Sequence, residues 1–141
     1  MKSAPEIESE TVLRLMGFLI RSVRKEAAKE LGALGMNQMD FMVLKMLSDR
    51  SLPPVTIASE LGVSRAAVTQ VTRKLEGEDL VRREQVKDDR RIALFRLTEK
   101  GASALRSAQR VYHACLMRRL GRVSAEDIVV LRRLLEKVVE A

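Results

Sequence analysis

Residues 55–75 read VTIASELGVSRAAVTQVTRKL, and this stretch decides the fold. Two short helices that cross at a steep angle need a small side chain where they touch, and Ala58 supplies one. Four residues later, Gly62 can adopt the left-handed backbone that a tight turn requires. Ser64 can accept a hydrogen bond from the first turn of the second helix. The pattern predicts a helix-turn-helix.

The second of the two helices, predicted at 55–61 and 64–76, carries donors and acceptors on its outer face. Arginine can bond bidentately to guanine and glutamine to adenine, whereas lysine and serine suit phosphates. An ordinary solvated helix face is the alternative interpretation. The candidate DNA contacts of this helix are Ser64, Arg65, Thr69, Gln70, Arg73 and Lys74, with Ser64 and Lys74 expected at phosphates.

A β-hairpin is predicted after the helix-turn-helix. Its strands cover Val81–Val86 and Ile92–Leu97, and five polar residues, Lys87–Arg91, join them at the tip. A basic two-stranded ribbon suits the minor groove of DNA, where narrow A·T-rich segments attract arginine. A plain solvated hairpin is the alternative.

The hairpin and its flanks closely resemble the multiple antibiotic resistance regulator (MarR) family of winged-helix repressors. The resemblance covers essentially the whole chain, and three segments carry it: Leu80-Val81-Arg82-Arg83, Asp89-Arg90-Arg91 and Leu97-Thr98-Glu99-Lys100-Gly101. It implies that Arg90 or Arg91 enters the minor groove. Because Asp89 is acidic, we do not expect it to contact DNA; we expect it to shape the wing by holding a neighbouring arginine. We expect Arg83 and Lys87 to contact the DNA backbone.

One position departs from the family pattern. The family usually has a glycine just before Leu80-Val81, and this chain has Asp79. Aspartate tolerates the left-handed backbone expected there better than most residues do. We therefore expect a slightly different entry into the strand and an intact hairpin.

Amphipathic helices are predicted on both sides of this central unit. One runs from Pro5 to the glycines near residue 35, and Asn37 with Asp40 has the spacing of a capping pair for a shorter helix. Two more begin after Thr98 and Ser124. The apolar faces of the terminal helices exceed what the centre can cover, so we expect them to pack on a second copy, with packing inside one domain as the alternative.

The predicted fold is therefore mainly α. It is a winged helix-turn-helix with a two-stranded β-wing and N- and C-terminal dimerisation helices. It forms one domain, residues 1–141, with a DNA-binding lobe at 36–100 and dimerisation helices at 1–35 and 101–141.

Composition excludes several classes of protein. One cysteine, Cys115, and one histidine, His113, cannot form a multi-thiolate zinc site or a zinc-hydrolase cluster. Cys115 lies on an apolar helix stripe, which favours a buried, inert thiol over an oxidation sensor. Without a phosphate loop, paired carboxylates, an apolar run of ~18 residues or a secretory signal, we expect a cytoplasmic protein with no catalytic residue, metal or cofactor. The net charge of +7 permits nucleic-acid binding but is spread along the chain.

The family resemblance also implies a small-molecule site. Many members bind small aromatic or anionic effectors in a cleft between the DNA-binding lobe and the dimerisation helices. Such a ligand shifts the population between DNA-competent and incompetent spacings of the two lobes. Core packing of the apolar side chains is the alternative. The residues expected to line the cleft are Phe18, Arg21, Met39, Met42 and Tyr112.

Together these patterns predict a homodimeric, sequence-specific DNA-binding transcriptional regulator. We expect a repressor of a palindromic operator, with half-sites about one helical turn apart, relieved by a small-molecule effector. Two other functions stay open: a non-specific architectural DNA-binding protein and a winged-helix protein-interaction module. The donors of the second helix and the arginines of the hairpin favour DNA over a protein partner.

Overall fold

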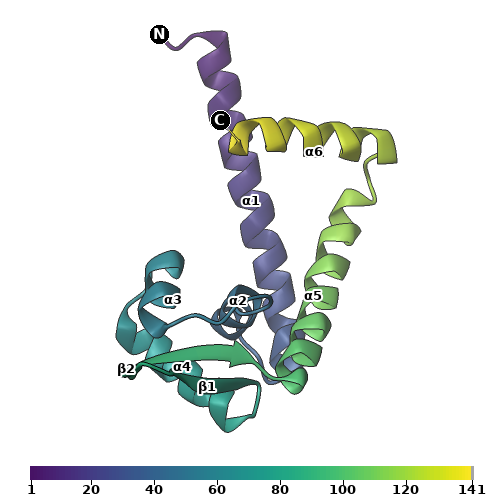
Figure 1. Ribbon diagram of the computed structural model, residues 1–141. Helices are drawn as coiled ribbons and strands as arrows, with labels where there is room; N and C mark the ends of the chain where they lie inside the picture. Colours follow the sequence, from purple (N-terminus) through teal and green to yellow (C-terminus); the bar gives the residue numbers. More distant parts are fainter. Residues whose placement is uncertain (141) are drawn as a thin grey trace.

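The computed structural model describes residues 1–140, apart from the side chain of Arg90. This part of the chain forms a small lobe from which long helices extend (Figure 1). The elements are α1 (Ala4–Ala33), α2 (Gln38–Met46), α3 (Pro54–Leu61), α4 (Arg65–Gly77), β1 (Val81–Val86), β2 (Asp89–Leu97), α5 (Glu99–Leu120) and α6 (Ala125–Val139). The mainly α winged helix-turn-helix predicted from the sequence is confirmed, and α3 and α4 agree with their predicted bounds within one residue.

Side-chain caps set where the helices begin. The Thr98 hydroxyl accepts from the N–H of Gly101 at 2.9 Å at the start of α5, and Ser124 caps α6 in the same way. At α2 the side chains of Asn37 and Asp40 each accept from the other's backbone N–H at 2.9 Å. Each cap satisfies a backbone donor that the first turn of a helix leaves unpaired. The capping pair predicted at Asn37 is therefore confirmed.

The turn between α3 and α4 has the predicted chemistry. Gly62 has φ 65°, in the left-handed region, and the N–H of Val63 donates to the carbonyl of Ala58 at 3.0 Å. Ala58 is buried where the two helices meet. Behind them the core of the lobe is apolar, and its fully buried side chains include Leu31, Val43, Leu44, Ile57, Val68, Leu75 and Phe95.

The entry to β1 is joined closely to the start of α5. Asp79 has the left-handed backbone predicted for it, with φ 59°. The Thr98 hydroxyl donates to the Asp79 carbonyl at 2.6 Å, and the Thr98 N–H donates to the Leu80 carbonyl at 3.1 Å. A Cβ on Gly101 would lie 1.9 Å from the carbonyl oxygen of Leu80. Only glycine fits at this contact.

The wing differs from the prediction in the length of its turn. The turn holds two residues, Lys87 and Asp88, and β2 begins at Asp89. The prediction of a five-residue tip was wrong, because Val86 pairs with Asp89 across the turn and this pair extends the two strands toward the tip. An isolated bridge also joins Leu52 to Phe95, with N–H···O distances of 3.0 and 2.8 Å. This bridge fixes the base of the wing to the chain before α3.

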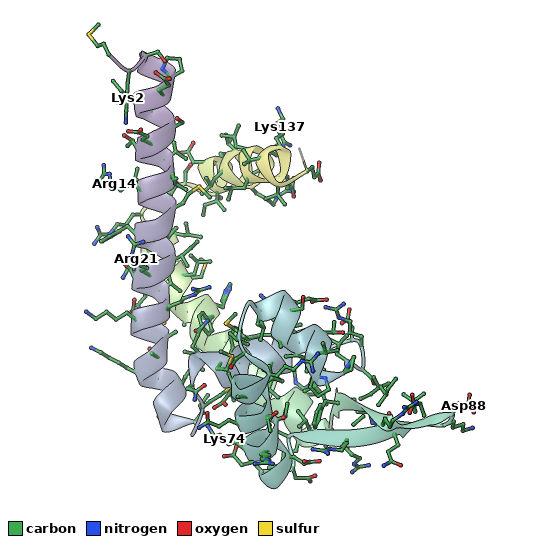
Figure 2. All side chains as sticks on the ribbon, turned by 90° about the vertical axis from the view of Figure 1, so that its left-hand side faces the viewer. Lys2, Arg14, Arg21, Lys74, Asp88 and Lys137 are labelled. Carbon is green, nitrogen blue, oxygen red and sulfur yellow. The ribbon has the colours of Figure 1, made fainter. Side chains whose placement is uncertain are left out.

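The N-terminal half of α1 and the whole of α6 pack little against the rest of the molecule. Within α1 only Val23, Ala27 and Leu31 are buried, and α6, described along its full length, has no buried residue. Both segments lie at the same end of the molecule, away from the lobe (Figures 1 and 2). Their exposed apolar side chains include Ile7, Leu13, Leu15 and Phe18 in α1, and Val130, Leu131, Leu134, Val138 and Val139 in α6.

Candidate nucleic-acid interface

The helix α4 turns one polar face away from the lobe. Val68, Thr72 and Leu75 are buried in the core, so the opposite side of the helix faces solvent. A helix with its side chains is about 10–12 Å in diameter, so it fits into a major groove about 12 Å wide. The exposed side chains on this face are Arg65, Thr69, Gln70 and Arg73, together with Ala66, which sequence reasoning did not include.

The first turn of α4 presents backbone donors as well. Ser64 caps the helix, since its Oγ accepts from the N–H of Ala67 at 3.1 Å. The Ser64 hydroxyl hydrogen is left free to donate to a phosphate near the positive end of the helix. The Thr69 hydroxyl donates to the carbonyl of Arg65 at 3.0 Å, so its oxygen faces outward as an acceptor. This helix therefore offers donors and acceptors in the mixture that base edges and phosphates require.

Lys74 has a partner inside the lobe. Its ammonium forms an ion pair with Asp40 of α2 and donates to the Gly35 carbonyl at 3.3 Å (Lys74 is labelled in Figure 2). The Asp40 side chain is 1% exposed, and a buried carboxylate needs a counter-charge. Lys74 therefore joins α2 to α4, and the phosphate contact predicted for it stays a prediction.

The wing carries an exposed arginine, Arg91, that is held by hydrogen bonds to Asp89. The Arg91 side chain is 92% exposed, and Asp89 Oδ1 accepts from its Nε at 3.2 Å and from its backbone N–H at 3.0 Å. Figure 2 shows the wing projecting from the lobe with Asp88 at its tip. Lys87 is exposed beside it. The side chain of Arg90, named as a candidate from the sequence, lies outside the described part of the chain.

Arg83 lies at the base of the wing. Its guanidinium is 3.6 Å from a carboxylate oxygen of Glu76 in α4, and its Cζ lies 5.2 Å from the ring centre of Phe95. Cation–π contact and ion pairing together brace β1 against α4. The side chain is still half exposed, so part of the guanidinium faces outward.

A cleft of about 580 Å³ lies between α1, α2 and α5. The rings of Phe41 and Tyr112 stack in it with centroids 4.4 Å apart, and the Tyr112 hydroxyl donates to the Gln38 side-chain oxygen. Arg24 and Lys45 place two cations at its walls. An apolar, aromatic cavity with cations at its edge suits a small aromatic anion.

Residues 36–93 match the MarR family. The HTH-type transcriptional repressor Rv2887 of Mycobacterium tuberculosis is 30% identical over 128 residues, which are 87% of this chain and 92% of Rv2887. This chain belongs to the MarR family. Members of the family are DNA-binding regulators and not enzymes.

Two further relatives extend the comparison. The transcriptional repressor MprA of Escherichia coli is 35% identical over 91 residues, 62% of this chain, and the match spans only 52% of the length of MprA. A mutant of MarR from E. coli has a TM-score of 0.81 at 23% identity, covering 89% of this chain and 94% of that one. MarR has also been solved with operator DNA, at a TM-score of 0.71, 22% identity and coverage of 93% and 95%. The E. coli MarR structures establish the shared fold.

The structure of Rv2887 contains a small molecule. That structure, a complex with salicylic acid, has a TM-score of 0.73 and 30% identity, covering 88% of this chain and 93% of the other. In the present MarR-family chain, Met42 and Tyr112 line the cleft as predicted. Phe18, Arg21 and Met39 were also predicted to line the cleft, and they do not belong to its lining.

The geometry of α1 and α2 explains these three errors. Leu19, Ile20, Val23 and Arg24 line the cleft, whereas Phe18 and Arg21 lie on the opposite side of α1. Met39 lies against α4 instead, beside Ala67, Gln70 and Val71. Sequence reasoning also missed Arg24, Gln38 and Lys45. The spacing of Gln38, Phe41, Met42 and Lys45 along one helix face was the signal that could have identified the α2 wall.

Cys115 is buried between α1 and α5, as predicted for this MarR-family chain. Burial raises the pKa of its thiol, although the Arg118 guanidinium, 3.2 Å from Sγ, opposes this effect. Arg118 also pairs with Glu26 at 2.7 Å and Glu30 at 2.9 Å, which joins α5 to α1. The thiol is therefore held protonated at neutral pH. Burial likewise raises the pKa of Tyr112, with Arg24 opposing it.

Two findings concern other kinds of site. Over residues 1–140, no three histidine, cysteine or acidic side chains group in a way that could hold a metal ion. Nor does this part of the chain contain a helix long and apolar enough to cross a membrane.

Proposed function

We propose that this chain is a homodimeric transcriptional repressor that binds a palindromic operator. The exposed polar face of α4, formed by Arg65, Thr69, Gln70 and Arg73, is the observation that carries the proposal. In this assignment Arg65, Gln70 and Arg73 meet base edges in the major groove. Ser64 and the first turn of α4 meet a phosphate. Two relatives, Rv2887 and MprA, are named as transcriptional repressors, which supports the direction of regulation.

The wing supplies the second part of the interface. Arg91, and Arg90 beside it, would enter the minor groove next to the segment that α4 contacts. Asp89 would not meet DNA, because its carboxylate carries the charge of the phosphates; it orients Arg91 instead. Lys87 and the outward part of Arg83 would contact the sugar-phosphate backbone. The exposure of Arg91 supports this arrangement.

A second copy of the chain would cover the apolar surfaces of α1 and α6. Residues 1–35 and 101–141 would then form the dimer part, and residues 36–100 the DNA-binding lobe. These helices expose more apolar side chains than the scattered apolar residues that are usual on the surface of a monomer. Two-fold symmetry would place two α4 helices on half-sites about 34–36 Å apart.

An aromatic carboxylate would relieve repression by binding the cleft. Phe41 and Tyr112 would contact the ring, and Arg24 or Lys45 would pair with the carboxylate. This chemistry is supported by the salicylic acid bound to Rv2887, a relative that matches this chain over most of its own length. The cleft lies between the long helices and the lobe, so its occupant contacts both.

The deciding experiment is selection of bound sequences from random duplexes by the full chain. We expect a palindromic consensus whose half-site centres are one helical turn apart. Arg73→Ala should relax one base position of that consensus, while Arg106→Ala, an exposed arginine on α5, should leave it unchanged. Binding without any consensus would instead identify an architectural DNA-binding protein. An absence of DNA binding would favour a protein-interaction module.

A further inference from the structure

The helix α2 lies between the cleft and α4. Gln38, Phe41, Met42 and Lys45 recur at intervals of three, four and seven residues and line the cleft. Asp40, about 150° from their mean direction at 100° per residue, lies on the opposite face of the same helix and meets α4. One helical turn thus contacts a ligand site on one side and the DNA-reading helix on the other.

Asp40 is the contact on the α4 side. Its Oδ2 accepts from the N–H of Asn37 at 2.9 Å and pairs with the ammonium of Lys74. Its Oδ1 is buried and has no hydrogen-bond partner in the described part of the chain. A buried carboxylate is strongly unfavourable without a counter-charge, so Lys74 must follow Asp40 when α2 moves. Lys74 belongs to the third turn of α4, directly after Arg73.

Gln38 and Tyr112 are the contacts on the cleft side. Gln38 is the first residue of α2 and accepts from the Tyr112 hydroxyl, and Phe41 stacks on the same ring. A molecule that enters the cleft must contact or displace this tyrosine. Since the Asn37–Asp40 capping box holds the first turn of α2 together, a displacement at Gln38 moves Asp40 as well.

We propose that Asp40 is a positioning residue that sets the orientation of α4 within the lobe and transmits changes in the cleft to it. The proposal rests on the function proposed above and adds to it. The occupant of the cleft would alter the tilt of the DNA-reading helix inside one lobe, and not only the spacing between two lobes. Tyr112, Gln38, Asp40 and Lys74 form the chain of contacts.

A double-mutant cycle tests this link without knowledge of the effector. Tyr112→Phe removes the hydroxyl that bonds to Gln38 and keeps the stacked ring. We expect it to change the Kd for the selected duplex by on the order of 2- to 30-fold. The same substitution should have no effect on Kd in an Asp40→Asn/Lys74→Gln background. That background removes the ion pair between α2 and α4 and leaves no unpaired buried charge, so it should fold.

Two matched variants separate coupling from general damage. Arg106→Gln removes the same charge from an exposed position of α5 outside the proposed interface, so the effect of Tyr112→Phe should persist in it. Lys74→Arg keeps the ion pair and should retain the coupling. Equal effects of Tyr112→Phe in the wild-type and paired backgrounds would overturn the proposal, as would no effect on Kd in the wild-type chain.

Hydrogen exchange gives a readout that does not depend on DNA. Tyr112→Phe should speed the exchange of α4 amides in the wild-type chain and leave it unchanged in the Asp40→Asn/Lys74→Gln background. If no duplex is bound selectively, the proposed function fails, and hydrogen exchange still decides whether Asp40 links the cleft to α4. Equal exchange changes in both backgrounds would count against the link.

Discussion

Gly101 sits so close to Leu80 that a Cβ at residue 101 would lie 1.9 Å from the Leu80 carbonyl oxygen. The same carbonyl accepts from the N–H of Thr98. The first turn of α5 is therefore seated directly on the entry to β1. This contact explains why a glycine ends the Leu-Thr-Glu-Lys-Gly segment that the family resemblance singled out.

Gly101→Ala should destabilise the protein by about 3 kcal/mol, because the new methyl group collides with backbone and not with a flexible side chain. Urea denaturation monitored by circular dichroism measures the free energy of unfolding. Gly77→Ala is the matched control, since a Cβ there meets nothing within 4 Å. It should be neutral or slightly stabilising. Equal stabilities of the two variants would show that the contact between α5 and β1 is looser than described.

Arg91→Ala should weaken operator binding and reduce the slope of log K against log salt by about one, because one cation no longer displaces counter-ions. Fluorescence anisotropy at several salt concentrations measures both quantities. Arg106→Ala removes the same charge from an exposed position of α5 outside the proposed interface and should leave the slope unchanged. An unchanged slope for Arg91→Ala would remove this residue from the interface.

Leu134→Glu in α6 should convert the proposed dimer to a monomer, since it places a charge in the apolar surface that a second copy would cover. Light scattering at micromolar concentration gives the mass. Val55→Glu serves as control: Val55 is a similarly exposed apolar residue in α3, and its variant should remain dimeric. A wild-type chain that is monomeric under these conditions would contradict the proposed assembly itself.

Cys115 should react slowly with a chromogenic disulfide reagent in the folded protein. Burial raises its pKa, so at neutral pH the thiolate fraction is smaller than for a free cysteine, and the reaction rate should rise with pH. In urea the thiol should react fully and fast. Rapid stoichiometric reaction of the native protein at pH 7 would show that the thiol is accessible and would reopen a redox role.

Local features of the fold could be predicted from the sequence because their causes lie within a few residues. The capping partners Asn37 and Asp40, the glycine in the α3–α4 turn and the left-handed Asp79 each follow from the chemistry of neighbouring positions. The hairpin and the terminal helices followed from residue patterns as well, and the family resemblance added the minor-groove role expected of the wing arginines. The prediction of the exposed face of α4 followed from helical periodicity alone.

Long-range contacts could not be predicted in this way. Lys74 is of a residue type that often contacts phosphates. Its partner Asp40 lies 34 positions earlier, in α2, and only the packing of α2 against α4 brings the two together. The lining of the cleft depends on how α1 crosses α2 and α5. Phe18 and Arg21 were predicted to line it, whereas Arg24, less than two turns away on another face of α1, does so. The two-residue turn of the wing depends on the pairing of Val86 with Asp89 across the hairpin.

The exposed apolar surface of α1 and α6 has a consequence for the amount of folded regulator. In the proposed dimer these helices complete their burial only when two chains meet, so assembly adds to the stability of the folded chain. Each tenfold dilution then lowers the apparent free energy of unfolding by about 1.4 kcal/mol. The lifetime of such a repressor would then depend on its own concentration. At low concentration part of the chains stay unassembled and are open to proteolysis, whereas at high concentration most chains are assembled and resist it.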